Sequence, residues 1–262
     1  MATILIHADA KAAENATAKR LLDKIAAKPD ATLGLATGGT MEQVYAILIE
    51  KARELNLSFA GLKSFNLDEY IGLSADHPQS YRTYMNKLLF DHVDIKPENT
   101  HLPRGDAADP AEEARRYEAM ITEQGGIDLQ LLGIGINGHI GFNEPSSSLG
   151  SRTRIKKLAS STMEANHRFF KPGEAVPTHA LTMGIATIMQ ARKVILLATG
   201  ATKADAIAAA LEGPVSTACP ASVLQFHPDV TVIIDEDAAS KLKLRDFYES
   251  IHPGGEEVYF VK

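Results

Sequence analysis

Cysteine is almost absent from this sequence, since Cys219 is the only one in 262 residues. A single cysteine excludes an internal disulfide and any metal site built from several thiolates. Such sparing use of cysteine is typical of a reducing compartment, and we therefore expect a cytoplasmic protein.

The sequence also lacks a surplus of positive charge and any long apolar run. The 27 Lys and Arg residues against 33 Asp and Glu residues give a formal net charge of −6, which argues against a nucleic-acid partner. No apolar run approaches the roughly 20 residues that span a bilayer, and the start of the chain lacks the basic region of a signal peptide. We expect neither a nucleic-acid nor a membrane partner, and any bound phosphate must be held by a local site.

What the sequence does contain is an alternation of short apolar runs and helical periodicity. Strand-like runs lie at Thr3–Ile6, Thr32–Ala36, Leu62–Asn66, Asp128–Ile134, Val194–Ala198 and Val230–Ile234. Helical spacing of apolar residues recurs at Val44–Leu55 and Ala204–Leu211, and Asp109 followed by Pro110 is typical of a helix start. This pattern predicts an α/β fold with an open, mostly parallel sheet and helices on both faces.

The chain shows no linker or composition shift that would divide it. We therefore expect a single domain over residues 1–262. Its least regular part, at about residues 160–177, suits a surface segment that acts as a lid, and we place that lid at about residues 158–180.

The densest group of polar residues follows the apolar run that begins at Asp128. Within Gly133–Pro145 it brings together Asn137, His139 and Glu144 among several glycines. The imidazole titrates near neutral pH, and the carboxylate five residues later could orient it. Loops at the carboxyl ends of strands are where open α/β sheets bind ligands. A metal site from His139, Glu144 and His179 matches no standard zinc spacing, so we expect no metal.

Two further loops follow predicted strands and suit an anion. Thr37, Gly38, Gly39 and Thr40 connect a strand to an amphipathic helix, where free backbone N–H groups and the helix dipole favour a negative charge. Lys203 would lie near a helix N-terminus, where the dipole disfavours a cation unless it faces an anion. A plain turn at the first loop and a solvated lysine at the second are the alternatives.

Two charged residues elsewhere are candidates for the same site. Arg168, in the expected lid, has a guanidinium that suits phosphate. Asp68 ends another strand candidate, and a carboxylate there can be desolvated and used as a base. A lone surface arginine and an aspartate that only caps the next turn remain the alternatives.

Motifs over almost the whole chain resemble the glucosamine-6-phosphate deaminase family. They are Thr37-Gly-Gly-Thr40, Phe65-Asn-Leu-Asp-Glu-Tyr-Ile-Gly72, Ser80-Tyr-Arg82, Phe90-Asp-His-Val-Asp-Ile95, Gly135–Pro145, Ser151–Lys156, Asn166–Phe170 and His179–Gly184. The resemblance implies a Rossmann-like fold. It also implies a deaminating aldose–ketose isomerase that converts glucosamine 6-phosphate and water to fructose 6-phosphate and ammonia, in the breakdown of amino sugars, without a cofactor.

The resemblance also assigns roles to single residues. Asp68 matches the family's proton-transfer base, His139 its ring-opening histidine, and Glu144 the acidic partner of that histidine. Residues 37–40, Arg168 and Lys203 match the site for the phosphate of the sugar-phosphate substrate.

The chain departs from family patterns at two places. Asn137 stands where one branch has Asp, and we expect its amide to reach the imidazole of His139 as part of the catalytic set. Allosteric members bind N-acetylglucosamine 6-phosphate between subunits at positions matching Ser147, Arg154 and Lys156, together with a tyrosine where this chain has Asp246. We therefore expect no such regulation, and the resemblance leaves open whether the chain forms a homo-oligomer.

Two competing functions remain. A 6-phosphogluconolactonase-like hydrolase would use His139 but would have no clear use for Asp68 as a C2–C1 base. A sensor domain that binds sugar phosphates without catalysis could keep the Thr37–Thr40 loop but would be free to lose all three catalytic candidates. The presence of Asp68, His139 and Glu144 together favours the deaminase.

Overall fold

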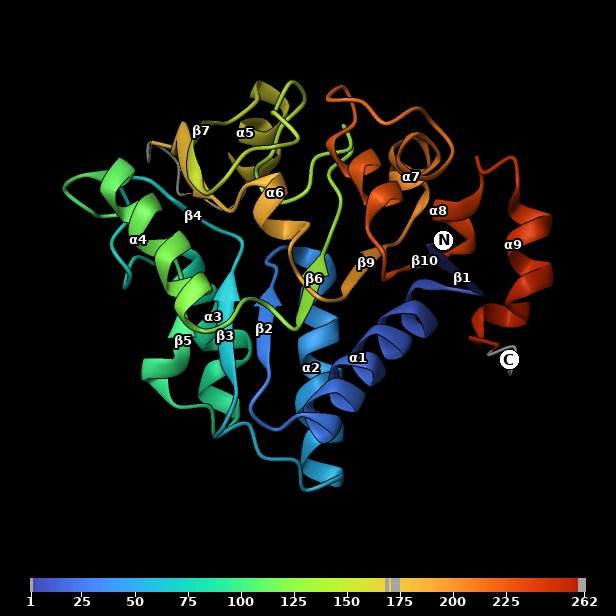
Figure 1. Ribbon diagram of the computed structural model, residues 1–262, viewed down its shortest axis with the longest axis horizontal. Helices are drawn as coiled ribbons and strands as arrows, with labels where there is room; N and C mark the ends of the chain where they lie inside the picture. The colour runs from blue at the N-terminus through green and yellow to red at the C-terminus, as the bar shows by residue number, and fades with distance from the viewer. Residues whose placement is uncertain (1, 168–169, 171–174, 259–262) are drawn as a thin grey trace.

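A computed structural model gives the fold of residues 2–167, 170 and 175–258 (Figure 1). In this part of the chain seven strands form one parallel sheet in the order β1-β10-β9-β6-β2-β3-β5. The strands are β1 (Thr3–His7), β2 (Thr32–Leu35), β3 (Lys63–Asn66), β5 (Thr100–His101), β6 (Leu129–Leu132), β9 (Val194–Ala198) and β10 (Val230–Asp235).

Every residue of the inner strands β2, β6, β9 and β10 is buried. Strands that bury both faces need helices on both sides of the sheet, and this is why they read as continuous apolar runs. The predicted fold class is confirmed. All six strands expected from the sequence are present, with ends that differ by at most two residues.

Helices alternate with the strands. They are α1 (Ala10–Ala27), α2 (Gly39–Glu54), α3 (Tyr81–Leu88), α4 (Pro110–Glu123), α5 (Ser160–His167), α6 (Ile185–Ile188), α7 (Ala204–Leu211), α8 (Glu236–Ala239) and α9 (Arg245–Ile251). The expected helix start at Asp109 is confirmed, because its carboxylate accepts the N–H groups of Ala111 and Glu112. No helix in the described part of the chain is long and apolar enough to cross a membrane.

A second, antiparallel sheet of three strands lies beyond the carboxyl ends of β2, β3 and β6, toward the top of Figure 1. It contains β4 (Asp68–Tyr70), β8 (His179–Thr182) and β7 (Arg154–Lys157), with β8 in the middle. The sequence did not predict this sheet, because its strands are short and β7 is mostly basic. Our expectation of an irregular segment at residues 160–177 was wrong for α5.

The order of the strands places a switch point between β2 and β6. From β2 the chain builds outward through β3 to β5, returns to the other side of β2 as β6, and continues outward through β9 and β10. The loops that leave β2 and β6 therefore diverge, which opens a crevice at the carboxyl ends of these two strands. Open α/β sheets bind their ligands at such a point.

Candidate active site

A cavity of about 290 Å³ lies at this switch point. Its walls come from the loops after β2, β3, β6 and β9, together with single side chains of α3 and α5. The predicted residues that line it are Thr37, Gly38, Gly39, Thr40, Asp68, Asn137, His139 and Lys203. The structure thus brings together candidates that lie up to 166 positions apart in the sequence.

The loop after β2 presents an uncapped helix end to the cavity. Gly38 is the N-cap of α2, and no side chain accepts the first N–H groups of that helix. Gly38 has a φ of 113°, a conformation that suits glycine. A methyl group added at Gly39 would meet no protein atom within 4 Å. The N–H groups at this end of α2 are therefore open to an anion.

Lys203 completes the anion-binding wall from the other side. It ends the short 3-10 turn Ala201–Lys203 after β9, and its Nζ donates to the carbonyl of Ile134 at 2.7 Å. Burial lowers the pKa of Lys203. No carboxylate pairs with Lys203 among the described residues, so a bound anion would be its natural partner.

Asp68 is the buried carboxylate of the cavity. It begins β4, is 6% exposed, and lines the cavity beside Gly141. Burial, followed by the negative charge of Glu69, raises the pKa of Asp68 to about 8, although the N–H of Phe142 opposes this. A carboxylate that holds its proton this tightly is a stronger base than an exposed aspartate once it is ionised.

His139 and Glu144 form a pair on the loop after β6. His139 Nδ1 lies 3.2 Å from Glu144 Oε2, within ion-pair range, but the ring N–H is not aligned well enough for a hydrogen bond. Burial alone would raise the pKa of Glu144. Interactions with His139, Thr162 and Asn137 outweigh burial and lower it to about 2. The carboxylate is therefore ionised at neutral pH and can orient the imidazole or stabilise its protonated form.

Asn137 is part of this group, but its contacts differ from our expectation. Its side-chain amide donates to Glu144 Oε2 at 2.8 Å rather than to the imidazole, and its Oδ1 accepts the backbone N–H of His139 at 3.3 Å. The neighbouring Gly138, with a φ of 81°, takes the left-handed turn. Asn137 therefore acts on the histidine through the carboxylate and the loop backbone.

The glycines of this loop explain how the histidine fits. A Cβ at Gly135 would stand 2.3 Å from His139 Cε1, so only glycine leaves room for the ring. The N–H of Gly135 donates to the carbonyl of His139 at 2.9 Å, which closes the loop on itself. The ring is thus placed by the backbone as well as by Glu144.

Three cavity residues were missed as site candidates. Thr162 of α5 donates to Glu144 Oε1 at 2.5 Å and lines the cavity, as do Tyr81 at the start of α3 and Phe142. Tyr81 stood within one of the motifs of the resemblance. Thr162 had no signal in the sequence, because only the packing of α5 over the loop brings it to Glu144.

Other predicted residues lie outside the cavity or outside the described residues. Arg168 is not among the residues that the structure describes. His179 is exposed at the start of β8 and contacts Thr178. Arg154 and Lys156 belong to β7, whereas Asp246 lies on α9, at the opposite end of the molecule in Figure 1. One chain therefore does not bring the expected effector residues together.

Arg154 and Ser147 contact the loop after β6 but do not line the cavity. Arg154 Nη1 donates to Asn143 Oδ1 at 2.9 Å, and Ser147 Oγ donates to the carbonyl of Glu144 at 2.6 Å. Both groups support the loop that carries the histidine.

Together these groups combine three capacities in one cavity. The end of α2 and Lys203 can hold an anion, Asp68 can exchange a proton with carbon, and the pair of His139 and Glu144 can move a proton between oxygens. In the described part of the chain no three His, Cys, Asp or Glu side chains gather as a metal site would require.

Comparison with known proteins gives a consistent result. The model of the family described as glucosamine-6-phosphate isomerases/6-phosphogluconolactonase matches residues 7–233. A glucosamine-6-phosphate deaminase of Shewanella loihica is 54% identical over 96% of this chain and 93% of its own length. Another, of Hahella chejuensis, is 58% identical over 84% of each chain.

Solved structures resemble the same fold. A structure described as a monomeric glucosamine-6-phosphate deaminase superposes with a TM-score of 0.89 at 47% identity, over 92% of this chain and all of its own. The 6-phosphogluconolactonase of Trypanosoma brucei superposes with a TM-score of 0.73 at 24% identity, over 92% of this chain and 99% of its own. The second likeness concerns the fold alone.

Proposed function

The chain belongs to the glucosamine-6-phosphate isomerase/6-phosphogluconolactonase family, and on that premise we propose that it is a glucosamine-6-phosphate deaminase. The reaction converts glucosamine 6-phosphate and water to fructose 6-phosphate and ammonia. Relatives named as such deaminases are 54% and 58% identical to it. The phosphogluconolactonase likeness, at 24% identity, supports no more than the fold.

The observation that carries the proposal is the buried Asp68 carboxylate in a cavity that also contains an anion site. Lactone hydrolysis needs an activated water and no exchange of a proton on carbon. Conversion of an aldose to a ketose needs a base that removes a proton from C2 and returns it to C1. The raised pKa of Asp68, about 8, suits that exchange.

Binding would begin with the phosphate. The dianion would accept hydrogen bonds from the N–H groups of Gly39 and Thr40 and from Lys203. These contacts lie away from the reacting carbons, so their binding energy holds the sugar against Asp68. His139, oriented by Glu144, would then move a proton from the C1 hydroxyl to the ring oxygen, which opens the ring to the aldehyde.

Asp68 would act on the open form. It takes the proton from C2 while the C1 oxygen gains one from solvent by way of His139, which gives an enol with the amino group on C2. Asp68 returns the proton to C1, and C2 becomes a protonated imine. Water adds to C2 and ammonia leaves, so the ketone of fructose 6-phosphate forms. Atoms balance, and no electrons are exchanged with a cofactor.

We also propose that the enzyme needs no metal, works in the cytoplasm and closes α5 over the bound sugar. The presence of only one cysteine, Cys219, supports a reducing compartment such as the cytoplasm. The hydrogen bond from Thr162 of α5 to Glu144 joins this helix to the catalytic pair, so closure of α5 would act on that carboxylate.

The test is an ammonia assay on the purified protein. Glucosamine 6-phosphate should release ammonia and fructose 6-phosphate, with and without a chelator, and Asp68→Asn should lower kcat by about 100-fold or more. The same preparation should hydrolyse 6-phosphogluconolactone far more slowly. Rapid lactone hydrolysis without ammonia release would assign the chain to the other branch of the family.

A further inference from the structure

Tyr84 makes a contact with the anion loop that neither the sequence motifs nor the proposed mechanism uses. Its hydroxyl donates to the carbonyl of Gly38 at 2.8 Å. Tyr84 does not line the cavity, so this carbonyl is held on the side of the loop that faces away from a ligand. The same carbonyl accepts the N–H of Met41 at 2.9 Å, in the first turn of α2.

The direction of that carbonyl decides the direction of a neighbouring N–H. In a trans peptide the C=O of Gly38 and the N–H of Gly39 point in opposite directions. While the carbonyl is held by Tyr84, the N–H of Gly39 is directed toward the cavity. If the peptide rotated, a carbonyl oxygen would face the anion and one donor would be lost.

Two consecutive glycines make such a rotation easy. Neither Gly38 nor Gly39 has a side chain to restrict it, and no side chain caps this end of α2. The first turn of a helix also frays more readily than its middle. The Tyr84 hydroxyl therefore adds a second hydrogen bond to a carbonyl that, among the described residues, is otherwise held only by the Met41 N–H of this first turn.

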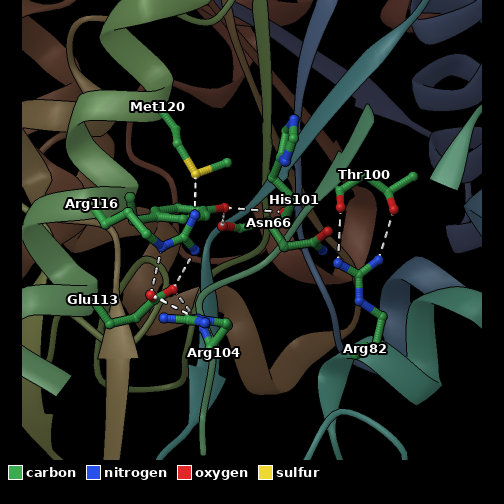
Figure 2. A network of polar contacts seen from close by, with 9 residues as sticks. Asn66, Arg82, Thr100, His101, Arg104, Glu113, Arg116 and Met120 are labelled. Atoms are coloured by element: carbon green, nitrogen blue, oxygen red, sulfur yellow. Dashed lines mark hydrogen bonds and ion pairs between the residues drawn. The ribbon is translucent and has the colours of Figure 1, made fainter. Parts of the chain in front are cut away.

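Tyr84 is itself held rigidly by α3. The carboxylate of Glu69 accepts the N–H groups of Tyr81 and Arg82 at 2.9 and 3.0 Å, which fixes the start of that helix beside the base Asp68. Figure 2 shows the guanidinium of Arg82 directed at Thr100 of β5, where it donates to the hydroxyl and the carbonyl at 2.7 and 2.9 Å. Met85 of the same helix is fully buried.

We propose that Tyr84 is a positioning residue of the phosphate site, which holds the Gly38–Gly39 peptide so that the Gly39 N–H faces the phosphate. Through α3 and Glu69, it also fixes the distance between the phosphate loop and Asp68. The inference rests on the proposed function only in taking the bound anion to be a phosphate.

The test compares Tyr84→Phe with Tyr248→Phe. The control also loses one tyrosine hydroxyl with a partner, Glu212, but it lies on α9 outside the cavity. Inorganic phosphate is titrated into each protein by calorimetry, and KM and kcat are measured with glucosamine 6-phosphate. For Tyr84→Phe the dissociation constant of phosphate and the KM should rise about threefold to tenfold, with kcat within about twofold. The control should match the unmodified protein.

A second measurement needs no variant. In the unmodified protein, the amide proton of Gly39 should shift downfield in NMR spectra as inorganic phosphate is added. The proposal would be overturned if Tyr84→Phe bound phosphate with unchanged affinity. It would also be overturned if the chemical shift of the Gly39 amide proton did not change as phosphate was added. If phosphate binds as expected while glucosamine 6-phosphate is not deaminated, the proposed function fails and the role of Tyr84 stands.

Discussion

At the scale of single residues, the proposed mechanism makes the pH dependence of the reaction follow the protonation of Asp68. Burial and Glu69 raise the pKa of Asp68 to about 8, so the carboxyl keeps its proton until the pH passes that value. Because the base must be ionised, kcat/KM, which reports the free enzyme, should rise with pH through about 8. An ordinary aspartate would complete this rise by about pH 5.

Glu69→Gln separates this effect from titration of the substrate amine, which is the same for every variant. The glutamine removes the neighbouring charge and also one of the two oxygens that accept N–H groups at the start of α3. The maximal rate should therefore fall, while the acidic limb of kcat/KM, which depends on the charge, should move to lower pH. Circular dichroism would establish that the variant is folded. A limb below pH 6 in the unmodified protein, or one that Glu69→Gln leaves in place, would contradict the account.

The shared location of most candidate residues could be predicted at this scale because they lie in short, distinctive loops. Thr37 to Thr40, Asp68, Asn137, His139 and Lys203 all line one cavity. The hydrogen-bond partners of these side chains were harder to predict than their places in the cavity. Asn137 donates to Glu144 instead of the imidazole, because the direction of an amide depends on loop geometry that spacing does not encode.

At the scale of elements, the proposed anion site is formed by the end of α2 and by Lys203, at the end of the loop before α7. Lys203→Met keeps the apolar stem and removes the charge. The KM for glucosamine 6-phosphate and the inhibition constant of inorganic phosphate should rise by about 10-fold to 100-fold, since a charge-assisted contact is lost. Loss in kcat should be smaller.

Lys241→Met is the matched control for this prediction. Lys241 pairs with Asp205 of α7 at 2.7 Å on the surface, outside the cavity. Its loss should leave KM unchanged. Steady-state kinetics of both variants decide the matter: equal KM values for Lys203→Met and the unmodified protein would remove Lys203 from the phosphate site.

The elements themselves were predictable where burial is complete. Strands such as β9 and β10, buried on both faces, stand out as apolar runs. The antiparallel sheet was missed because β7 has basic residues at its partly buried positions, Arg154 and Lys156, and exposes Ile155, and because β4 is only three residues long. Such strands form because tertiary contacts hold them, so local sequence carries little of their signal.

At the scale of the whole molecule, regulation depends on whether separate parts of the chain meet. Arg154 and Lys156 lie on β7, and Asp246 on α9 is at the other end of the molecule (Figure 1). A carboxylate at Asp246 would also repel a phosphate. We predict hyperbolic kinetics that N-acetylglucosamine 6-phosphate does not change. A sigmoidal curve that this compound makes hyperbolic would contradict the prediction.

The transfer of a proton from C2 to C1 by Asp68 is the central claim, and deuterium at C2 of glucosamine 6-phosphate tests it most directly. The labelled substrate should react with a lower kcat/KM, and the product should carry part of the deuterium at C1 of fructose 6-phosphate, because a buried carboxylate exchanges its hydrogen slowly with water. Mass spectrometry of the product measures both isotope position and yield. The account would be contradicted if the labelled substrate reacted with an unchanged kcat/KM and the product carried only hydrogen from solvent at C1.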